Sequence, residues 1–320
     1  MTDAVSQSAA RSARALRRIK DMIYRTPLLP SRALGDETGC DLRFKAENFQ
    51  ITGSFKIRGA SSKMTMLEPG QKLITASSGN HGIASSRAAS LSNQHLSVVL
   101  PETVAKTKLA KIRTYAVDVI LHGTDPGKAE AHAQFLAASG EYSYVSPYND
   151  LDVIAGQGTI GIELLDQADQ IDNVFVAMGG GGLISGVGSV LKSFGTNTRI
   201  FGVAAKNSAA LAASMQAGQV VETEHLETLA DGVAGAVDEG SVTLPLAMSV
   251  VDEVVVCDEA EIVSALRRLA LDENMLVEGA AALALAGFMQ ISDQLRGQTS
   301  IILLCGGNFD TDKVISLIHS

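Results

Sequence analysis

The chain has 320 residues, of which 46% are hydrophobic, and a formal net charge of -9. This length exceeds what one hydrophobic core holds and indicates two lobes, while the acidic balance argues against non-specific binding to nucleic acid or to an anionic membrane surface. No apolar run is long enough to span a bilayer, so we expect a soluble globular protein. The three cysteines, Cys40, Cys257 and Cys305, are an odd number without metal-site spacing, which predicts no disulfide framework and a reducing compartment, the cytoplasm.

Short aliphatic runs alternate with helical patterns along the chain, after an amphipathic N-terminal segment that lacks the apolar core of a signal peptide. The predicted strands are Leu42–Ala46, Leu73–Ala76, Leu96–Leu100, Val117–Leu121, Tyr142–Val145, Val174–Ala177, Ile200–Val203, Val251–Val256 and Ile301–Leu304. The predicted helices include Asn80–Leu91, Lys106–Tyr115, Gly127–Ala138, Ile154–Ala168, Leu183–Phe194, Glu259–Asn274 and Gly279–Gln290. This alternation indicates an α/β protein with parallel sheets, in which ligands bind where the carboxyl ends of strands meet helix N-termini.

Four consecutive glycines follow one predicted strand and open a helix, in "MGGGGLISG" from Met178 to Gly186. Because glycine has no Cβ, an anion can approach the backbone N–H groups closely, and the positive end of the helix dipole favours it. The spacing fits neither the G-x-G-x-x-G dinucleotide pattern nor a P-loop. One glycine would suffice for a tight turn, so the run of four predicts a phosphate site.

A second strand-to-helix junction, "TASSGNHGIA" from Thr75 to Ala84, surrounds a glycine with polar residues. The hydroxyls of Ser77 and Ser78 and the backbone N–H groups at such a helix start suit a substrate carboxylate. Simple N-capping needs only one polar residue, so we favour a binding role. His81 in this stretch also fits a histidine buried in the core.

A lone lysine, Lys56, lies beside Phe55 in the small-residue stretch "TGSFKIRGASSKM". It fits an ordinary lysine in the first turn of a helix, or an amine that loses its proton easily in apolar surroundings and acts as a nucleophile. The stretches "LADGVAG" and "LLCGGNFD" would each be ordinary turns on their own. A lysine amine, a phosphate cradle and a carboxylate cradle together predict pyridoxal 5'-phosphate held as a Schiff base on Lys56.

Five stretches in order, "SFKIRGA", "SSGNHG", "VIAGQGTI", "GGGGLISG" and "CGGN", resemble the motifs of the fold type II pyridoxal-phosphate enzymes, the tryptophan synthase beta-like fold. The resemblance is greatest to the threonine/serine dehydratase and serine racemase branch. It implies two lobes, each with a mainly parallel sheet flanked by helices. Residues 1–52 and 147–320 would form a large cofactor-binding domain, and residues 53–146 a small mobile domain inserted in it. It also implies a homodimer.

The resemblance assigns roles to the residues at matching positions. It implies that Lys56 carries the cofactor and then moves the α-proton of the substrate. Ser78 matches the second base of the racemases, although dehydratases often have a serine there too. The implied cofactor ligands are Phe55, Lys56, Asn80, Gly179, Gly180, Gly181, Gly182, Leu183, Gly232 and Cys305, and the implied substrate ligands are Ser77, Ser78, Asn80 and His81.

The implied reaction is α,β-elimination of a small L-β-hydroxy amino acid, by default threonine or serine, to a 2-oxo acid and ammonia. One alternative is a dehydratase of 3-hydroxyaspartate, which would need a cation such as Arg58 or Arg113 for the second carboxylate. Others are a dehydratase of hydroxyectoine breakdown and a serine or amino-acid racemase. A non-catalytic binder with this fold would be expected to lack Lys56.

The chain departs from the family pattern at two places. Cys305 stands where a serine or threonine usually faces the pyridine nitrogen. A thiol is a weaker donor than a hydroxyl, and it leaves that nitrogen uncharged, which favours elimination over transamination. Ala204 and Ala210 stand where metal-activated members carry acidic residues, so we expect no divalent metal at that site. Tyr148 resembles the dehydratases, and it also fits a packing residue with its hydroxyl bonded locally.

Overall fold

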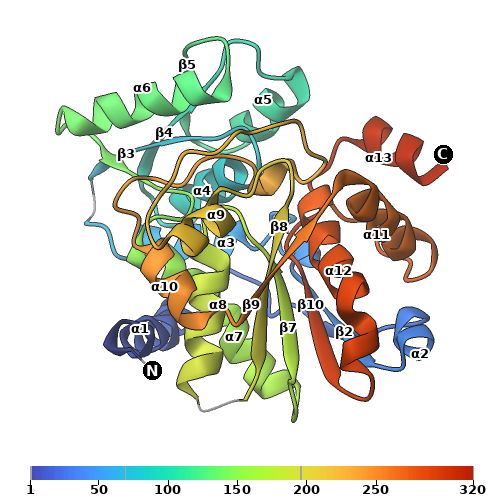
Figure 1. Ribbon diagram of the computed structural model, residues 1–320. Helices are drawn as coiled ribbons and strands as arrows, with labels where there is room; N and C mark the ends of the chain where they lie inside the picture. The colour runs from blue at the N-terminus through green and yellow to red at the C-terminus, as the bar shows by residue number, and fades with distance from the viewer. Residues whose placement is uncertain (1, 69, 195–196, 320) are drawn as a thin grey trace.

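The computed structural model, which describes residues 2–68, 70–194 and 197–319, contains two separate β-sheets (Figure 1). In the larger sheet neighbouring strands are parallel, except for the antiparallel pair β1 and β2 at one edge. Its strands in spatial order are β1 (Leu28–Pro30), β2 (Asp41–Ala46), β10 (Thr299–Leu304), β7 (Asn173–Ala177), β8 (Arg199–Ala205) and β9 (Glu253–Cys257).

The smaller sheet is parallel throughout its described pairs. Its strands in spatial order are β5 (Asp118–Leu121), β4 (His95–Leu100), β3 (Lys72–Ala76) and β6 (Ser143–Tyr144). The two sheets confirm the predicted α/β architecture, and each of the nine predicted strands is present. The sequence did not indicate β1, because three residues that end in proline carry no alternation pattern, and proline is tolerated only at such an edge.

Helices cover both faces of the larger sheet (Figure 1). On one face, α12 (Gly279–Ile291) packs against β7, β8 and β10, and α11 (Glu259–Leu271) packs on α12. On the other face, α7 (Leu151–Gln167) packs against α8 (Gly182–Ser193), and α1 (Asp3–Ile19) lies on both. The remaining helices are α2 (Leu34–Thr38), α3 (Lys56–Met64), α4 (Asn80–Leu91), α5 (Lys106–Arg113), α6 (Pro126–Ala138), α9 (Ala210–Ala217), α10 (Thr243–Val250) and α13 (Thr311–His319), with 3-10 turns η1 (Glu47–Phe49), η2 (Asp231–Val233) and η3 (Ser292–Leu295). Among the described residues, no helix combines the length and the apolar character needed to cross a bilayer.

Helix α3 joins the two parts of the molecule. One side of it, with Ile57 and Met64, belongs to the hydrophobic core of the smaller sheet. The other side crosses α7 at a pair of glycines, Gly59 and Gly156. A Cβ on Gly59 would lie 2.3 Å from Gln157 Nε2, and a Cβ on Gly156 would lie 2.3 Å from the Arg58 carbonyl oxygen. The two helix backbones therefore approach more closely than side chains at these positions would allow, which fixes where α3 crosses α7.

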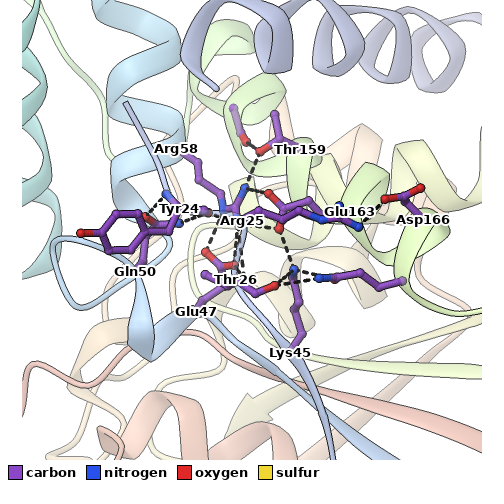
Figure 2. A network of polar contacts seen from close by, with 12 residues as sticks. Tyr24, Arg25, Thr26, Lys45, Glu47, Gln50, Arg58, Thr159, Glu163 and Asp166 are labelled. Carbon is purple, nitrogen blue, oxygen red and sulfur yellow. Dashed lines mark hydrogen bonds and ion pairs between the residues drawn. The ribbon is translucent and has the colours of Figure 1, made fainter. Parts of the chain in front are cut away.

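A buried cluster of two cations and two carboxylates holds the first turn of α3 against the larger sheet (Figure 2). Arg58 is fully buried, and its Nε donates to Glu47 Oε2 at 2.8 Å while its Nη1 donates to Glu163 Oε1 at 2.6 Å. Lys45, on β2, donates to Glu163 Oε2 at 2.6 Å. Burial alone would lower the pKa of the Arg58 guanidinium, but attraction to Glu47 and Glu163 outweighs it and raises that pKa. The cluster is electrically balanced and satisfied by hydrogen bonds, which is the condition for burying charge.

Candidate active site

Lys56 is the first residue of α3, and the chain just before it is tied to the end of β10. Phe55 N donates to the Cys305 carbonyl oxygen at 3.0 Å, and Ser54 forms an isolated bridge with Gly306. The Lys56 Nζ atom donates to the Pro147 carbonyl oxygen at 2.9 Å and lies 5.1 Å from the centroid of the Phe55 ring. The amine therefore lies between the end of the central strand β10 and the chain that enters α7.

The environment of Lys56 favours its neutral form. Burial lowers the pKa of its ammonium from 10.5 to about 8, against the opposing attraction of Cys305 and Glu278. At pH 7 roughly a tenth of this amine is unprotonated, whereas an ordinary lysine is almost entirely charged. A neutral amine is a nucleophile and a base, so this lysine is suited to attack a carbonyl carbon and to accept a proton.

The predicted phosphate site connects the end of β7 to the start of α8. A Cβ on Gly179 would lie 2.8 Å from the Val233 carbonyl oxygen, and a Cβ on Gly180 would lie 2.4 Å from Tyr148 Cγ. Gly181 has φ +86°, a left-handed conformation that favours glycine. Gly182 and Leu183 open α8, where the first-turn N–H groups have no partner within the helix. The loop is thus a backbone cradle at a helix N-terminus, which suits a phosphate.

The predicted carboxylate site lies at the start of α4. Ser77 Oγ accepts from Gly79 N at 3.2 Å, and a Cβ on Gly82 would lie 1.8 Å from the Ser77 carbonyl oxygen. The serine loop is therefore folded tightly over the first turn of the helix. Ser78 is half-buried in the same loop. The first-turn N–H groups of α4 are available to an anion.

The ring of His81 is buried and bonded to the end of β3 and to the chain after β6. His81 is 4% exposed, and its Nε2 lies 2.9 Å from Thr75 Oγ1 and 3.0 Å from the Val145 carbonyl oxygen. Burial, with the nearby Lys56 cation, lowers the pKa of the imidazole to about 3. The ring is therefore neutral and occupied in the core, and only the backbone N–H of His81 is left for a substrate carboxylate.

A buried carboxyl that the sequence did not single out connects two of the predicted ligands. Asn80 Nδ2 lies 2.9 Å from both carboxylate oxygens of Glu278, and Cys305 Sγ lies 3.8 Å from Glu278 Oε1. Burial raises the pKa of Glu278 to about 7 and that of the Cys305 thiol well above its ordinary value. A Cβ on Gly306 would lie 2.6 Å from Glu278 Oε1, so this glycine makes room for the carboxyl. Near neutral pH the Cys305 sulfur carries its proton.

Two more predicted residues border the same space. A Cβ on Gly232 would lie 3.3 Å from Ala280 Cβ and 3.5 Å from Glu278 Oε1, which places Gly232 beside Glu278. Tyr148 lies against the glycine loop, and its hydroxyl accepts from Asp238 N at 2.8 Å. This local bond agrees with a packing role for Tyr148 at the phosphate cradle.

The suggestion that Arg58 binds a second substrate carboxylate is wrong. Its guanidinium is fully buried and bonded to Glu47 and Glu163. Arg113 is exposed on α5. Among the described residues there is no group of three or more histidine, cysteine, aspartate or glutamate side chains able to hold a metal ion.

Comparison with known proteins decides the family. The family model described as "Pyridoxal-phosphate dependent enzyme" matches residues 19–306. The chain belongs to this family. It is 35% identical over 308 residues to the L-threonine ammonia-lyase of Thermotoga maritima, which covers 95% of this chain and 76% of the relative. It is also 35% identical over 304 residues to the L-threo-3-hydroxyaspartate ammonia-lyase of Saccharomyces cerevisiae, covering 94% of this chain and 93% of the relative.

Solved structures agree with this family of pyridoxal-phosphate-dependent enzymes. The processed form of threonine deaminase isoform 2 from Solanum lycopersicum superimposes with a TM-score of 0.95 and 30% sequence identity. The superposition covers 100% of this chain and 94% of that one. The predicted fold type II architecture, with two mainly parallel sheets flanked by helices, is confirmed.

Proposed function

We propose that the protein is a pyridoxal-phosphate-dependent dehydratase, an ammonia-lyase that converts an L-β-hydroxy amino acid of the threonine or serine type to a 2-oxo acid and ammonia. The observation that carries the proposal is a partly buried lysine of lowered pKa beside the end of β10. The parallel neighbour of β10, β7, leads into the glycine loop at the start of α8, and Asn80 at the start of α4 is bonded to Glu278 beside Cys305. The names of the relatives from Thermotoga maritima and Solanum lycopersicum support the same reaction.

The site fits pyridoxal 5'-phosphate. Gly179 to Leu183 would bind its phosphate through backbone N–H groups at the start of α8, and side chains on Gly179 and Gly180 would collide with Val233 and Tyr148 and displace this loop. Lys56 would hold its aldehyde carbon as a Schiff base, with Phe55 against the ring. Asn80 would bind the ring hydroxyl, and Cys305 would face the ring nitrogen with Gly232 nearby. When bound, the cofactor withdraws electrons from the α-carbon of an amino acid and makes its α-proton acidic.

The residues of this chain then perform three tasks. The N-terminus of α4, with Ser77, Ser78 and the backbone N–H of His81, binds the substrate carboxylate. The neutral Lys56 amine accepts the α-proton, which its lowered pKa allows near neutral pH. The Cys305 thiol keeps its proton and donates only weakly, so it does not place a full positive charge on the ring nitrogen. Loss of the β-hydroxyl and hydrolysis of the released enamine give the 2-oxo acid and ammonia.

A 3-hydroxyaspartate dehydratase is the second candidate, and the name of the Saccharomyces cerevisiae relative favours it. It needs a cation other than Arg58 for the second carboxylate. Racemisation is a third candidate that Ser78 leaves open, with Lys56 and Ser78 as bases on opposite faces of the substrate.

We further propose that residues 53–146 form a mobile lobe between the two parts, 1–52 and 147–320, of a cofactor-binding lobe. The strands β3 to β6 all lie within 53–146, which agrees with this division. The protein would act in the cytoplasm as a homodimer without a divalent metal. A gel-filtration and light-scattering measurement checks the dimer.

A substrate panel tests the proposed reaction. Purified enzyme loaded with cofactor is given L-threonine, L-serine and the threo and erythro isomers of 3-hydroxyaspartate, with and without EDTA. We expect 2-oxo acid from one of these substrates and no effect of EDTA. Formation of D-serine from L-serine without 2-oxo acid would replace the dehydratase by a racemase, and no reaction with any substrate would refute the proposed function.

A further inference from the structure

A chain of hydrogen-bonded side chains leads from the surface of α5 to Asn80. The exposed Lys111 donates through Nζ to Asn308 Oδ1 at 2.7 Å. Asn308 Nδ2 donates to Asn80 Oδ1 at 2.7 Å, and Asn80 Nδ2 donates to both oxygens of Glu278 at 2.9 Å. Lys111 and Asn80 lie on α5 and α4, beside the smaller sheet, while Asn308 and Glu278 adjoin β10 and α12 of the larger sheet. This series of hydrogen bonds therefore runs from the part of the molecule with the smaller sheet to the part with the larger sheet.

In this series of hydrogen bonds, the groups at the ends determine which atom donates and which accepts at each step. A side-chain amide has a donor end and an acceptor end, and either can face a given neighbour. The Lys111 ammonium can only donate, and the Thr52 carbonyl oxygen, which accepts from Asn308 Nδ2 at 2.8 Å, can only accept. Asn308 satisfies both neighbours in one orientation alone. That orientation presents an N–H group to Asn80, which must offer its oxygen to Asn308 and its nitrogen to Glu278.

The position of the Asn308 side chain is built into the loop that precedes Lys56. A Cβ on Gly53 would lie 2.8 Å from Asn308 Oδ1 and 2.9 Å from Asn308 Nδ2. Gly53 has φ +75°, in the left-handed region that favours glycine. Gly307 N also donates to the Gly53 carbonyl oxygen at 2.8 Å. Two glycine positions thus hold the amide between Thr52 and Asn80.

We infer that Lys111 and Asn308 are positioning residues, which fix the end of the Asn80 amide that faces the cofactor. The inference rests on the proposed function, in which Asn80 Nδ2 donates to the ring hydroxyl of pyridoxal phosphate. A reversed Asn80 amide would present its oxygen, which cannot donate a hydrogen bond to that ring oxygen. The exposed Lys111 thereby acts on the cofactor through two amides, without touching it.

Asn308→Asp is the stringent test, since aspartate has nearly the same shape but no N–H group. The introduced carboxylate still accepts from Lys111, but Asn80 must turn its nitrogen toward it. We expect the dissociation constant of pyridoxal phosphate to rise by up to about tenfold, as for the loss of one hydrogen bond. We also expect the visible absorbance of the bound cofactor to titrate at a different pH. Both quantities come from absorbance titrations of the purified enzyme, together with thermal unfolding of each variant.

Lys111→Met is a second variant that keeps the test possible if Asn308→Asp does not fold. Lys111 is exposed, so replacing it should leave the fold intact. It removes one of the two groups that orient Asn308, leaving the Thr52 carbonyl oxygen as the other, and keeps the aliphatic stem. We expect cofactor binding weaker by about twofold to tenfold, with the absorbance titration shifted in the same direction as in Asn308→Asp. The matched control is Lys108→Met, which removes the same charge from an exposed position on the same helix.

The outcomes separate this inference from the proposed function. Wild-type protein that develops no visible band with pyridoxal phosphate would overturn both. A wild-type band together with unchanged affinity and unchanged titration in Asn308→Asp and Lys111→Met would overturn the inference alone. Equal shifts in Lys111→Met and Lys108→Met would also overturn it, since they would reflect overall charge. A shift in Lys111→Met and Asn308→Asp that Lys108→Met lacks is the result we expect.

Discussion

Replacing Glu278 with glutamine tests the charge of the carboxyl that lies between Asn80 and Cys305. This side chain is 4% exposed, and burial raises its pKa from 4.5 to about 7. One pKa unit corresponds to about 1.4 kcal/mol. Ionising Glu278 in the folded protein therefore costs about 3 kcal/mol more than ionising it in the unfolded chain.

The sign of the pH dependence follows from proton uptake. Between pH 4.5 and about 7 the folded protein holds a proton on Glu278 that the unfolded chain has released. The stabilising contribution of the group is thus complete below pH 4.5 and is lost as the pH rises through 7. Glutamine does not titrate, so any effect of its amide on Asn80 is the same at every pH.

Equilibrium urea unfolding of the cofactor-free protein measures the effect across this pH window. Circular dichroism is the appropriate signal, because the chain has no tryptophan. The free energy of unfolding of Glu278→Gln minus that of the wild type should rise by about 3 kcal/mol from below pH 4.5 to above pH 7. Parallel pH profiles for the two proteins would show that Glu278 ionises normally and would refute the reasoning.

Three further perturbations have defined outcomes. Arg58→Met should lower the free energy of unfolding in urea by about 3 to 5 kcal/mol, because two buried carboxylates lose their partner; wild-type stability would contradict this. Gly180→Ala should weaken binding of pyridoxal phosphate in an absorbance titration, since its Cβ would lie 2.4 Å from Tyr148 Cγ; an unchanged dissociation constant would argue against the cradle. The rate at which the visible band forms should rise with pH through about 8, as Lys56 loses its proton; a pH-independent rate would mean that another amine reacts.

The parts of the site that are continuous in sequence could be predicted from the sequence. Gly179 to Leu183 and Ser77 to His81 each follow a strand and open a helix, and both junctions lie where they were expected. Local composition was sufficient there, because the chemistry of a helix N-terminus resides in its own backbone.

The residues that the sequence missed act through contacts between distant segments. Glu278 precedes an alanine-rich apolar helix and looks like an N-terminal cap, and only the packing of α12 beside β10 brings it to Asn80. Arg58 follows Lys56 by two residues, and on a helix that spacing turns it by about 200°. The same turn therefore directs Lys56 to the site and Arg58 into the buried cluster, which the sequence pattern did not reveal.

The central claim is that Lys56 holds pyridoxal phosphate between the two cradles. The most direct test is to load the purified protein with the cofactor, reduce it with borohydride, digest it and locate the modified lysine by mass spectrometry, with Lys56→Ala as the control. The account predicts the modification on Lys56 in the wild type and its loss in the variant. Modification of a different lysine, or a labelled Lys56→Ala protein, would contradict it.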